Sequence, residues 1–565
     1  MPNPREISRY CSSLVIIVST KDARDKNNED VELRLAHFSV KEYLTSSRVH
    51  ENFTQEFKEA AAKASIATVC VAYLLHLDQE IPVREIPKAL PFAKYCARHW
   101  IGHAAVSEEE DGILHKLVME FFLVRKRSFT AWYYLYNPDR PWDDDMDERR
   151  TEPASALYYA SLGGLTNQVK ALIAHNVNVN AQGGDYGNAL QAASSEGHKK
   201  IVQMLLDKRA DVNVQGGIYG NALQAASSGG HEKIVQMLLD KGADVNTQGG
   251  HYGNALQAAS SGGHEKIIQM LLDKGADVNT QGGNYGNALQ AASSGGHEKI
   301  VQMLLDKGAD VNAQGGGYGN AFRAASSGGH EKIVQMLLDK RVDVNTQGGG
   351  YDNAIQVASF RGHKKIVQML LDKGADVNAQ DGYYGSALQA ASSEGHEKIV
   401  QMLLDKGADV NAQGGIYGNA LQAASSGGHE KIVQMLLDKG ADVNAQGGDY
   451  GNALQAASSR GHKKIVQMLL DKGVDVNAQG GNYGNALQAA SFRGHEEIFQ
   501  MLLDEGADVN AQGGGYGNAL QAASFGGHEK IVQILLGKGA DVNAQVGHNG
   551  NALQAASLGG HEKIV

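Results

Sequence analysis

Histidine, serine and aspartate recur at fixed intervals through most of this sequence, and these residue types bind metals or catalyse acyl transfer. One histidine follows another at 33-residue spacing, from His198 through His231 and His264 to His561. A zinc site needs several ligands that converge on one ion, and a catalytic triad is a single constellation. A ladder of identical residues supplies neither. We therefore interpret the histidines as hydrogen-bonding residues at helix starts, and we predict no metal site and no catalytic residue.

Other signatures of chemistry are also missing from the sequence. The Asp-Val-Asn triplets, such as the one at Asp244 and Asn246, lack the convergent carboxylates of a calcium loop, so we expect hydrogen-bond ladders between repeats there. No GxSxG, HExxH or GxxxxGK[ST] occurs, so we predict no enzyme, cofactor or nucleotide. The three cysteines, Cys11, Cys70 and Cys96, form no CxxC and are expected to be buried, reduced thiols of a cytoplasmic protein.

The recurring residues belong to one phrase of 33 residues, clearest at 253–285 as GNALQAASSGGHEKIIQMLLDKGADVNTQGGNY. A fixed period of this length indicates a solenoid, in which each unit buries its apolar stripe against its neighbours. The copies begin at residues 154, 187, 220, 253, 286, 319, 352, 385, 418, 451, 484, 517 and 550.

Each unit is expected to contain two short helices and a loop. Asn254 suits the N-cap of a helix at 255–261, because its side-chain oxygen can accept an orphan backbone amide. Gly262-Gly263 ends that helix, and an apolar stripe at helical spacing predicts a second helix at 264–274. The glycine-rich remainder is expected to form an extended loop or hairpin tip.

This phrase resembles the ankyrin repeat, whose Thr-Pro-Leu-His signature appears here as Asn-Ala-Leu-Gln at 254–257. The Gly-His, Leu-Leu and Gly-Ala-Asp-Val-Asn elements match closely. The resemblance implies an all-α ankyrin-repeat solenoid with a hairpin loop in each unit, made of twelve full repeats and a truncated thirteenth. It also implies a protein-binding scaffold. The altered signature leaves open how the first helix of each repeat is capped.

Composition changes sharply at Ala154. All eight prolines and all three tryptophans precede it, together with only Gly102 and Gly112 of the 69 glycines. We predict a helical, winged-helix-like domain at 1–136, a Pro- and Asp-rich linker at 137–153 and the array at 154–565. Within the first part, 13–19 and 32–37 are expected to pair as a hairpin, with a helix following from Ser39.

Four segments of this N-terminal part resemble the region between the NACHT domain and the ankyrin array of fungal NOD-like receptors. They lie at 35–46, 69–75, 92–100 and 155–164. The resemblance implies the sensor arm of such a receptor without its NACHT domain, as the C-terminal portion of a longer protein. The alternative is a stand-alone ankyrin adaptor. The net charge of −11 argues against nucleic acid as a partner, and no apolar run is long enough for a membrane. The expected partner is a protein.

Positions that vary among near-identical repeats are the candidates for contacting that partner, because packing fixes the others. They lie on the first helix, at its exit or in the loop tip, and neutral drift is the competing explanation. Val342 and Ile355 also vary and are expected to compensate packing. Each ring of the tyrosine column is expected to pack on the first helix of the next repeat, and an aromatic contact stripe is the alternative. The predicted contact residues are Arg323, Phe360, Arg361, Tyr383, Ile416, Arg460, Phe492, Arg493 and Phe525.

Two arginines replace the glycine that ends the second helix in most repeats. Arg209 and Arg341 occupy this position. A glycine at a helix end is typical of the left-handed backbone conformation, so both arginines are predicted to adopt it at an energetic cost. The truncated last repeat, from Gly550 onward, is expected to fray first.

Overall fold

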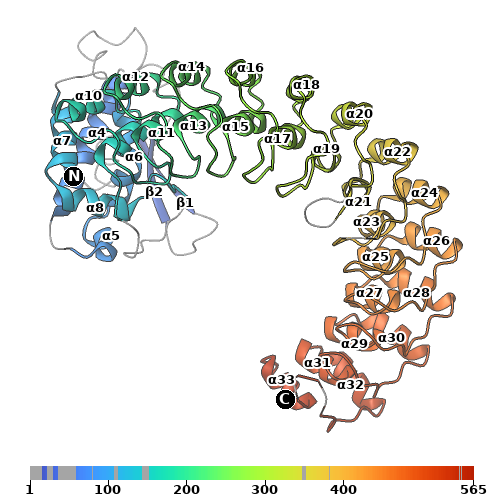
Figure 1. Ribbon diagram of the computed structural model, residues 1–565. Coiled ribbons are helices and arrows are strands. Elements are labelled where there is room, and N and C mark those ends of the chain that lie inside the picture. The colour runs from blue at the N-terminus through green and yellow to red at the C-terminus, as the bar shows by residue number, and fades with distance from the viewer. Residues whose placement is uncertain are drawn as a thin grey trace. The chain divides into compact units, whose positions relative to one another are not determined.

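The computed structural model describes residues 15–21, 29–35, 59–78, 81–106, 112–142, 152–346, 352–380, 382–545, 547–548 and 550–565. The chain divides into two compact units, Met1–Ala243 and Asp244–Val565 (Figure 1).

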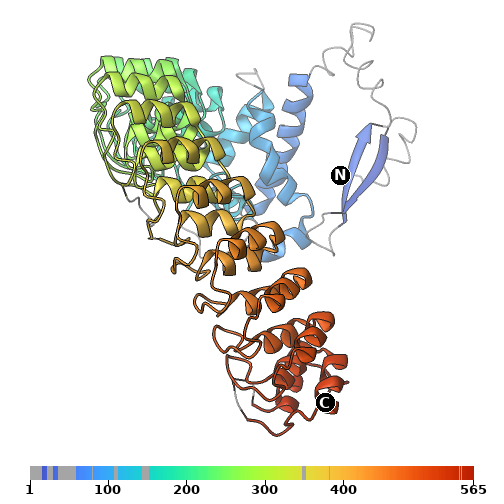
Figure 2. The same cartoon turned by 90° about the vertical axis from the view of Figure 1, so that its right-hand side faces the viewer.

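The first unit begins with an antiparallel hairpin, drawn as two arrows in Figure 2. Strand β1 (Val15–Lys21) pairs with β2 (Glu29–Leu35), and Val15 lies opposite Leu35. The predicted hairpin is therefore confirmed. The helix predicted from Ser39 lies outside the described residues, as does Cys11.

A helical core follows the hairpin. Trp100, Phe121 and Trp132 are fully buried and lie edge to face, with ring centroids 5.7 to 5.9 Å apart. Cys70 and Cys96 are buried free thiols, as expected. The elements are α4 (Glu59–Leu75), η1 (His76–Asp78), η2 (Val83–Glu85), α5 (Ile86–Ala89), α6 (Ala93–Ala104), α7 (Ile113–Leu123) and α8 (Lys126–Leu135).

Aromatic packing continues from α8 into the first repeat. Tyr159 of helix α9 (Ala156–Leu162) lies 5.2 Å from Trp132 and 5.9 Å from Phe129, measured between ring centroids. Asp139, in the predicted linker, is buried and accepts a hydrogen bond from the Tyr158 hydroxyl. The N-terminal helices and the first repeat thus share one core. The predicted boundaries of a domain at 1–136, a linker at 137–153 and the array at 154–565 follow the change of composition in the sequence. As domain boundaries they stay a prediction.

The repeats follow the predicted two-helix plan in both units. In Figure 1 the helices of the second unit form two rows, one of first helices and one of second helices. The first unit contains α9 (Ala156–Leu162), α10 (Thr166–Ala174), α11 (Ala189–Ser195), α12 (Lys199–Asp207), α13 (Ala222–Ser228) and α14 (Glu232–Asp240). The second contains α15 (Ala255–Gly262), α16 (Glu265–Asp273), α17 (Ala288–Gly295), α18 (Glu298–Asp306), α19 (Ala321–Gly328), α20 (Glu331–Asp339), α21 (Ala354–Phe360), α22 (Lys364–Asp372), α23 (Ala387–Ser393), α24 (Glu397–Asp405), α25 (Ala420–Gly427), α26 (Glu430–Asp438), α27 (Ala453–Arg460), α28 (Lys463–Asp471), α29 (Ala486–Arg493), α30 (Glu496–Asp504), α31 (Ala519–Gly526), α32 (Glu529–Gly537) and α33 (Ala552–Leu558).

An Asn–Gln pair caps most of the first helices, which answers the question left open by the altered signature. The exceptions are α9 with Ser155 and Tyr158, α19 with Asn320 and Arg323, and α23 with Ser386 and Gln389. In α17, Asn287 Oδ1 accepts from the Gln290 amide at 2.8 Å, and Gln290 Oε1 accepts from the Asn287 amide at 3.1 Å. This is a capping box with glutamine in the second role. Gln290 Nε2 also donates to the carbonyl oxygens of Ala313 and Gly319, at 3.0 and 3.1 Å. One buried side chain therefore caps its helix and ties down the following loop.

Most histidines of the 33-residue column bond to the preceding repeat, in addition to their predicted place at a helix start. His330 Nε2 lies 3.1 Å from the Ser294 carbonyl oxygen. Gly296 directly precedes His297 but faces the ring of His330, the column histidine of the next repeat. A Cβ atom on Gly296 would approach that ring to 2.5 Å, so the absence of a side chain there leaves room for His330. The histidines are tethers between repeats.

The predicted asparagine ladder is confirmed. Asn279 Oδ1 accepts from the Asp310 amide at 2.8 Å, and Asn279 Nδ2 donates to the Gly308 carbonyl at 3.2 Å.

Arg209 and Arg341 both have φ of 61°, which confirms the predicted left-handed backbone. In the last repeat, Leu553 is 54% exposed, whereas Leu520 one repeat earlier is 1% exposed. Among the described helices, none is long and apolar enough to cross a membrane.

A candidate partner-binding surface

Seven of the nine predicted contact residues belong to a ribbon of aromatic and arginine side chains in the second unit. The ribbon runs along the ends of the first helices and the loop tips of the repeats that begin at 352 and later, and we call it the aromatic–arginine strip. The tyrosine column forms its other edge. Its members are Phe360, Arg361, Tyr383, Tyr384, Tyr417, Tyr450, Arg460, Tyr483, Phe492, Arg493, Tyr516 and Phe525.

The strip is most continuous over α29 and α31. Phe492 stacks on Tyr516 with ring centroids 4.1 Å apart and planes 29° apart. It also stacks on Phe525 at 6.1 Å, and Tyr483 stacks on Tyr516 at 6.0 Å. All four rings are partly exposed. Because rings of neighbouring repeats support one another, this part of the strip is an ordered apolar surface that solvent still reaches.

Two arginines of the strip are held by tyrosine hydroxyls. Arg460 donates from Nη2 and Nε to Tyr450 Oη at 2.6 and 3.2 Å. Arg493 donates from Nη2 to Tyr483 Oη at 3.0 Å, and its guanidinium carbon lies 5.2 Å from the Phe492 ring centroid. Hydrogen bonding to Tyr450 raises the pKa of Arg460, so this cation stays charged. The sequence did not reveal the arginine–tyrosine pairs, although both recur at a ten-residue spacing.

A second patch of the strip lies around α21. Phe360 stacks on Tyr384 at 4.1 Å, and the Arg361 guanidinium carbon lies 5.9 Å from the Phe360 ring centroid. Tyr383 is 58% exposed and meets Tyr384 edge to face at 5.4 Å. Ile416 occupies the corresponding loop tip of the next repeat, where its amide donates to the Tyr383 carbonyl at 3.2 Å. Ring contacts of the tyrosine column thus run along the column and onto the ends of first helices.

Arg323 lies apart from the strip. It replaces the glutamine of the capping box, is only partly exposed, and donates from Nη1 to the Tyr318 carbonyl at 2.8 Å. Burial lowers the pKa of Arg323, whereas the charge of the buried Asp352 opposes that shift. The side chain therefore braces its own loop, which sequence comparison could not distinguish from a surface role. Val342 and Ile355 are buried, as expected of packing compensation.

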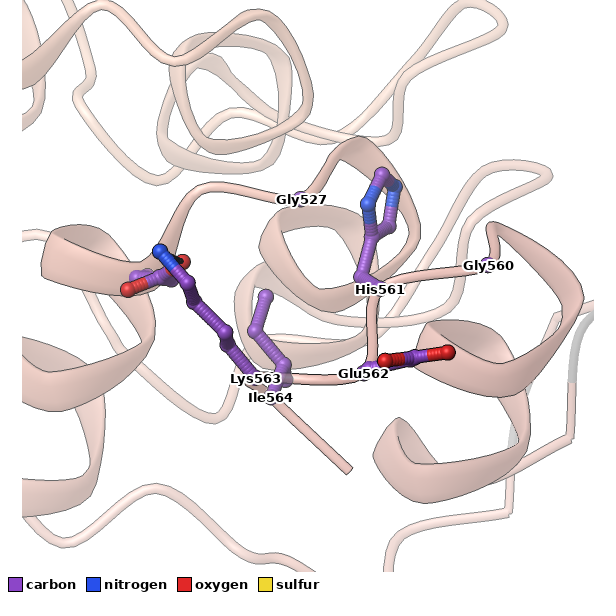
Figure 3. Close-up of a pocket in the computed structure, with 7 residues that line it drawn as sticks. Gly527, Gly560, His561, Glu562, Lys563 and Ile564 are labelled. Atoms are coloured by element: carbon purple, nitrogen blue, oxygen red, sulfur yellow. Dashed lines mark ion pairs between the residues drawn. The ribbon is translucent and has the colours of Figure 1, made fainter.

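Two other features of the described residues bear on small-molecule binding. These residues contain no cluster of three or more histidine, cysteine, aspartate or glutamate side chains that could hold a metal ion. A pocket near the end of the chain is lined by Gly527, Glu529, Gly560, His561, Glu562, Lys563 and Ile564. Figure 3 shows His561, Lys563 and Ile564 around it. His561 bonds to the Phe525 carbonyl and Lys563 pairs with Glu529, so these groups serve the stacking of repeats.

Comparison with known proteins agrees with the repeat architecture. A model of ankyrin repeats in three copies matches residues 103–216 and, in overlapping segments, 222–315, 289–381, 321–414, 380–447, 421–513 and 487–565. The azaphilone pigments biosynthesis cluster protein L of Monascus ruber is 41% identical over 197 residues. The matched region is 32% of this chain and spans 41% of that relative. Since the family model covers well over half of the sequence and the helices follow its plan, this chain belongs to the ankyrin repeat family.

Proposed function

We propose that this chain is a non-enzymatic scaffold that binds a protein partner through the aromatic–arginine strip. The observation that carries the proposal is the contrast within one array. The repeats at 253–346 place Ser-Gly at the ends of their first helices, whereas later repeats place Phe360, Arg460, Phe492 and Phe525 at the same positions. Scaffold packing does not require these side chains, because the plain repeats fold on the same plan without them.

The chemistry of the strip suits a protein interface. Aromatic residues and arginine are enriched in such interfaces and supply most of their hot spots. Phe492 and Tyr516 are already stacked, so little rotamer entropy remains to be lost on binding. Arg460 is likewise held by Tyr450. A preorganised surface of this kind favours affinity because the partner need not order it.

For the biological role, we propose the sensor arm of a NOD-like receptor. The support is the resemblance of the N-terminal segments at 35–46, 69–75, 92–100 and 155–164 to the region that precedes the array in such receptors. The stand-alone adaptor remains the alternative. Identifying the captured partner separates them, because a receptor arm binds an activating ligand and acts on a NACHT domain, whereas an adaptor joins two other proteins.

The test is affinity capture with the full chain and with a strip-restored variant. The variant carries Phe492→Ser, Phe525→Ser, Arg460→Gly and Arg493→Gly, each of which is the residue of the plain repeats. A control variant carries Lys299→Gln and Lys332→Gln, which alter exposed lysines of second helices.

We expect the partner captured by the original chain and by the control to be lost from the strip-restored variant, with unchanged circular dichroism. Equal capture by all three chains would show that the binding surface lies elsewhere.

A further inference from the structure

Many exposed lysines on the second helices of the second unit form ion pairs with glutamates, unlike the strip arginines Arg460 and Arg493. Along the second helices, Lys299 pairs with Glu265 at 3.4 Å, Lys332 with Glu298 at 3.1 Å and Lys530 with Glu496 at 3.1 Å. At Lys463 and Glu497 the pair is present with its charges reversed. Within the described residues, Arg460 and Arg493 form no ion pair with a carboxylate. Their hydrogen-bond acceptors are the neutral hydroxyls of Tyr450 and Tyr483.

The two guanidinium groups keep donors available. Arginine carries five N–H donors in a planar fork. At Arg460, Nε and Nη2 reach Tyr450, so the Nη1 donors remain for another acceptor. At Arg493, a single contact to Tyr483 fixes the group while its guanidinium lies over Phe492. A fork held on an aromatic ring matches the geometry of a carboxylate, which accepts two parallel hydrogen bonds.

The two cations occupy the same position in successive repeats, and an apolar platform lies beside the second. Arg460 ends α27 and Arg493 ends α29, while Phe492, Tyr516 and Phe525 stack next to Arg493. An extended peptide that follows the row of first helices would meet one arginine, then the other, then the rings. Nucleic acid is disfavoured because the chain carries a net charge of −11.

The geometry points to an acidic peptide segment of a partner protein as the ligand of the strip, with carboxylates on Arg460 and Arg493 and an apolar side chain on the Phe492 platform. This inference rests on the proposed function and names the chemistry of its partner. Since both arginines are exposed, each carboxylate contact should depend on salt, and the apolar contact should not.

A random peptide library displayed on phage, selected on the full chain, tests this inference without knowledge of the partner. Selection is repeated on the Arg460→Gly, Arg493→Gly variant and on the Phe492→Ser, Phe525→Ser variant. We expect peptides specific to the original chain to be enriched in Asp and Glu beside an apolar residue. A synthetic peptide from this pool should bind at least tenfold more weakly to the double arginine variant.

Charge reversal supplies the matched control. With Arg460→Glu and Arg493→Glu, the same peptide should bind only after its Asp and Glu residues are changed to Lys. Peptides that require the phenylalanines but show no acidic enrichment would overturn this inference and leave the proposed function standing. Peptides that bind all variants equally, or a library that yields no binders, would contradict both.

Discussion

Replacing Arg209 and Arg341 with glycine should stabilise the array. Both have φ of 61°, whereas the equivalent position in other repeats is held by glycines such as Gly242 and Gly275, with φ of 84°. A Cβ atom built on Gly275 meets no atom within 4 Å. The penalty for a larger residue is therefore one of backbone conformation and not of steric collision.

The size of the effect follows from two opposing contributions. A left-handed backbone costs an L-residue roughly 1–2 kcal/mol. Glycine offsets about 0.4–1 kcal/mol of this gain, because it increases the conformational entropy that the unfolded chain loses on folding. Both arginine side chains are exposed, so little packing is lost. We expect each substitution to raise the local free energy of unfolding by about 0.5–1 kcal/mol, and the two distant changes to add.

Native-state hydrogen exchange is the suitable assay, because repeat arrays open locally. The amides of α12 should become more protected in the Arg209→Gly variant, and those of α20 in the Arg341→Gly variant. The matched control is Gly275→Ala, which should lower the protection of α16 by about as much as the arginines cost. Decreased protection in both glycine variants, or no loss in Gly275→Ala, would refute the reasoning from backbone strain.

Three further predictions concern charge, buried hydroxyls and pH. Lys463 and Glu497 form an ion pair 2.8 Å long between neighbouring second helices, with the charges reversed relative to pairs such as Lys299 and Glu265. Lys463→Glu should therefore destabilise α28, and adding Glu497→Lys should rescue it. A double-mutant cycle measures the coupling between the two residues, which should fall as salt is added. Ser293 is fully buried and its hydroxyl has no hydrogen-bond partner, so Ser293→Ala should stabilise α17 by roughly 1 kcal/mol, and a lower urea midpoint would contradict this. Burial raises the pKa of Asp139 from 3.8 to about 6, so folding favours its protonated form and this contribution to stability is lost as pH rises toward and through 6. Asp139→Asn should therefore flatten the pH dependence of the urea midpoint between pH 4 and 7, and an unchanged slope would count against a buried Asp139.

The sequence predicts the repeat but not every contact that joins repeats. Local spacing predicts the 33-residue period and the two helices of each repeat. The conformational preference of glycine predicts the left-handed backbone at Arg209. The bond from a column histidine such as His330 to the preceding repeat joins residues 36 positions apart, and the contacts of Gln290 with the following loop span 23 and 29 positions. Which residues meet across these sequence separations depends on how the repeats stack, and the period of the sequence alone does not define that stacking.

The candidate surface shows the same limit. Phe360, Phe492 and Arg493 were identified because they depart from the repeat, and all three lie on the strip. Arg323 departs from it equally, but its guanidinium turns inward to the Tyr318 carbonyl. Rotamer and burial decide between these outcomes, and neither is encoded by the departure itself.

Site-specific photo-crosslinking tests the central claim, that this array binds a protein through the aromatic–arginine strip. A benzophenone amino acid is placed at Phe525, on the strip, and at Ser294, which occupies the same position of a plain repeat. Both chains are irradiated with the partner recovered by affinity capture. We expect a crosslinked product at position 525 and little at 294. Equal crosslinking at both positions, or crosslinking at 294 alone, would contradict this claim.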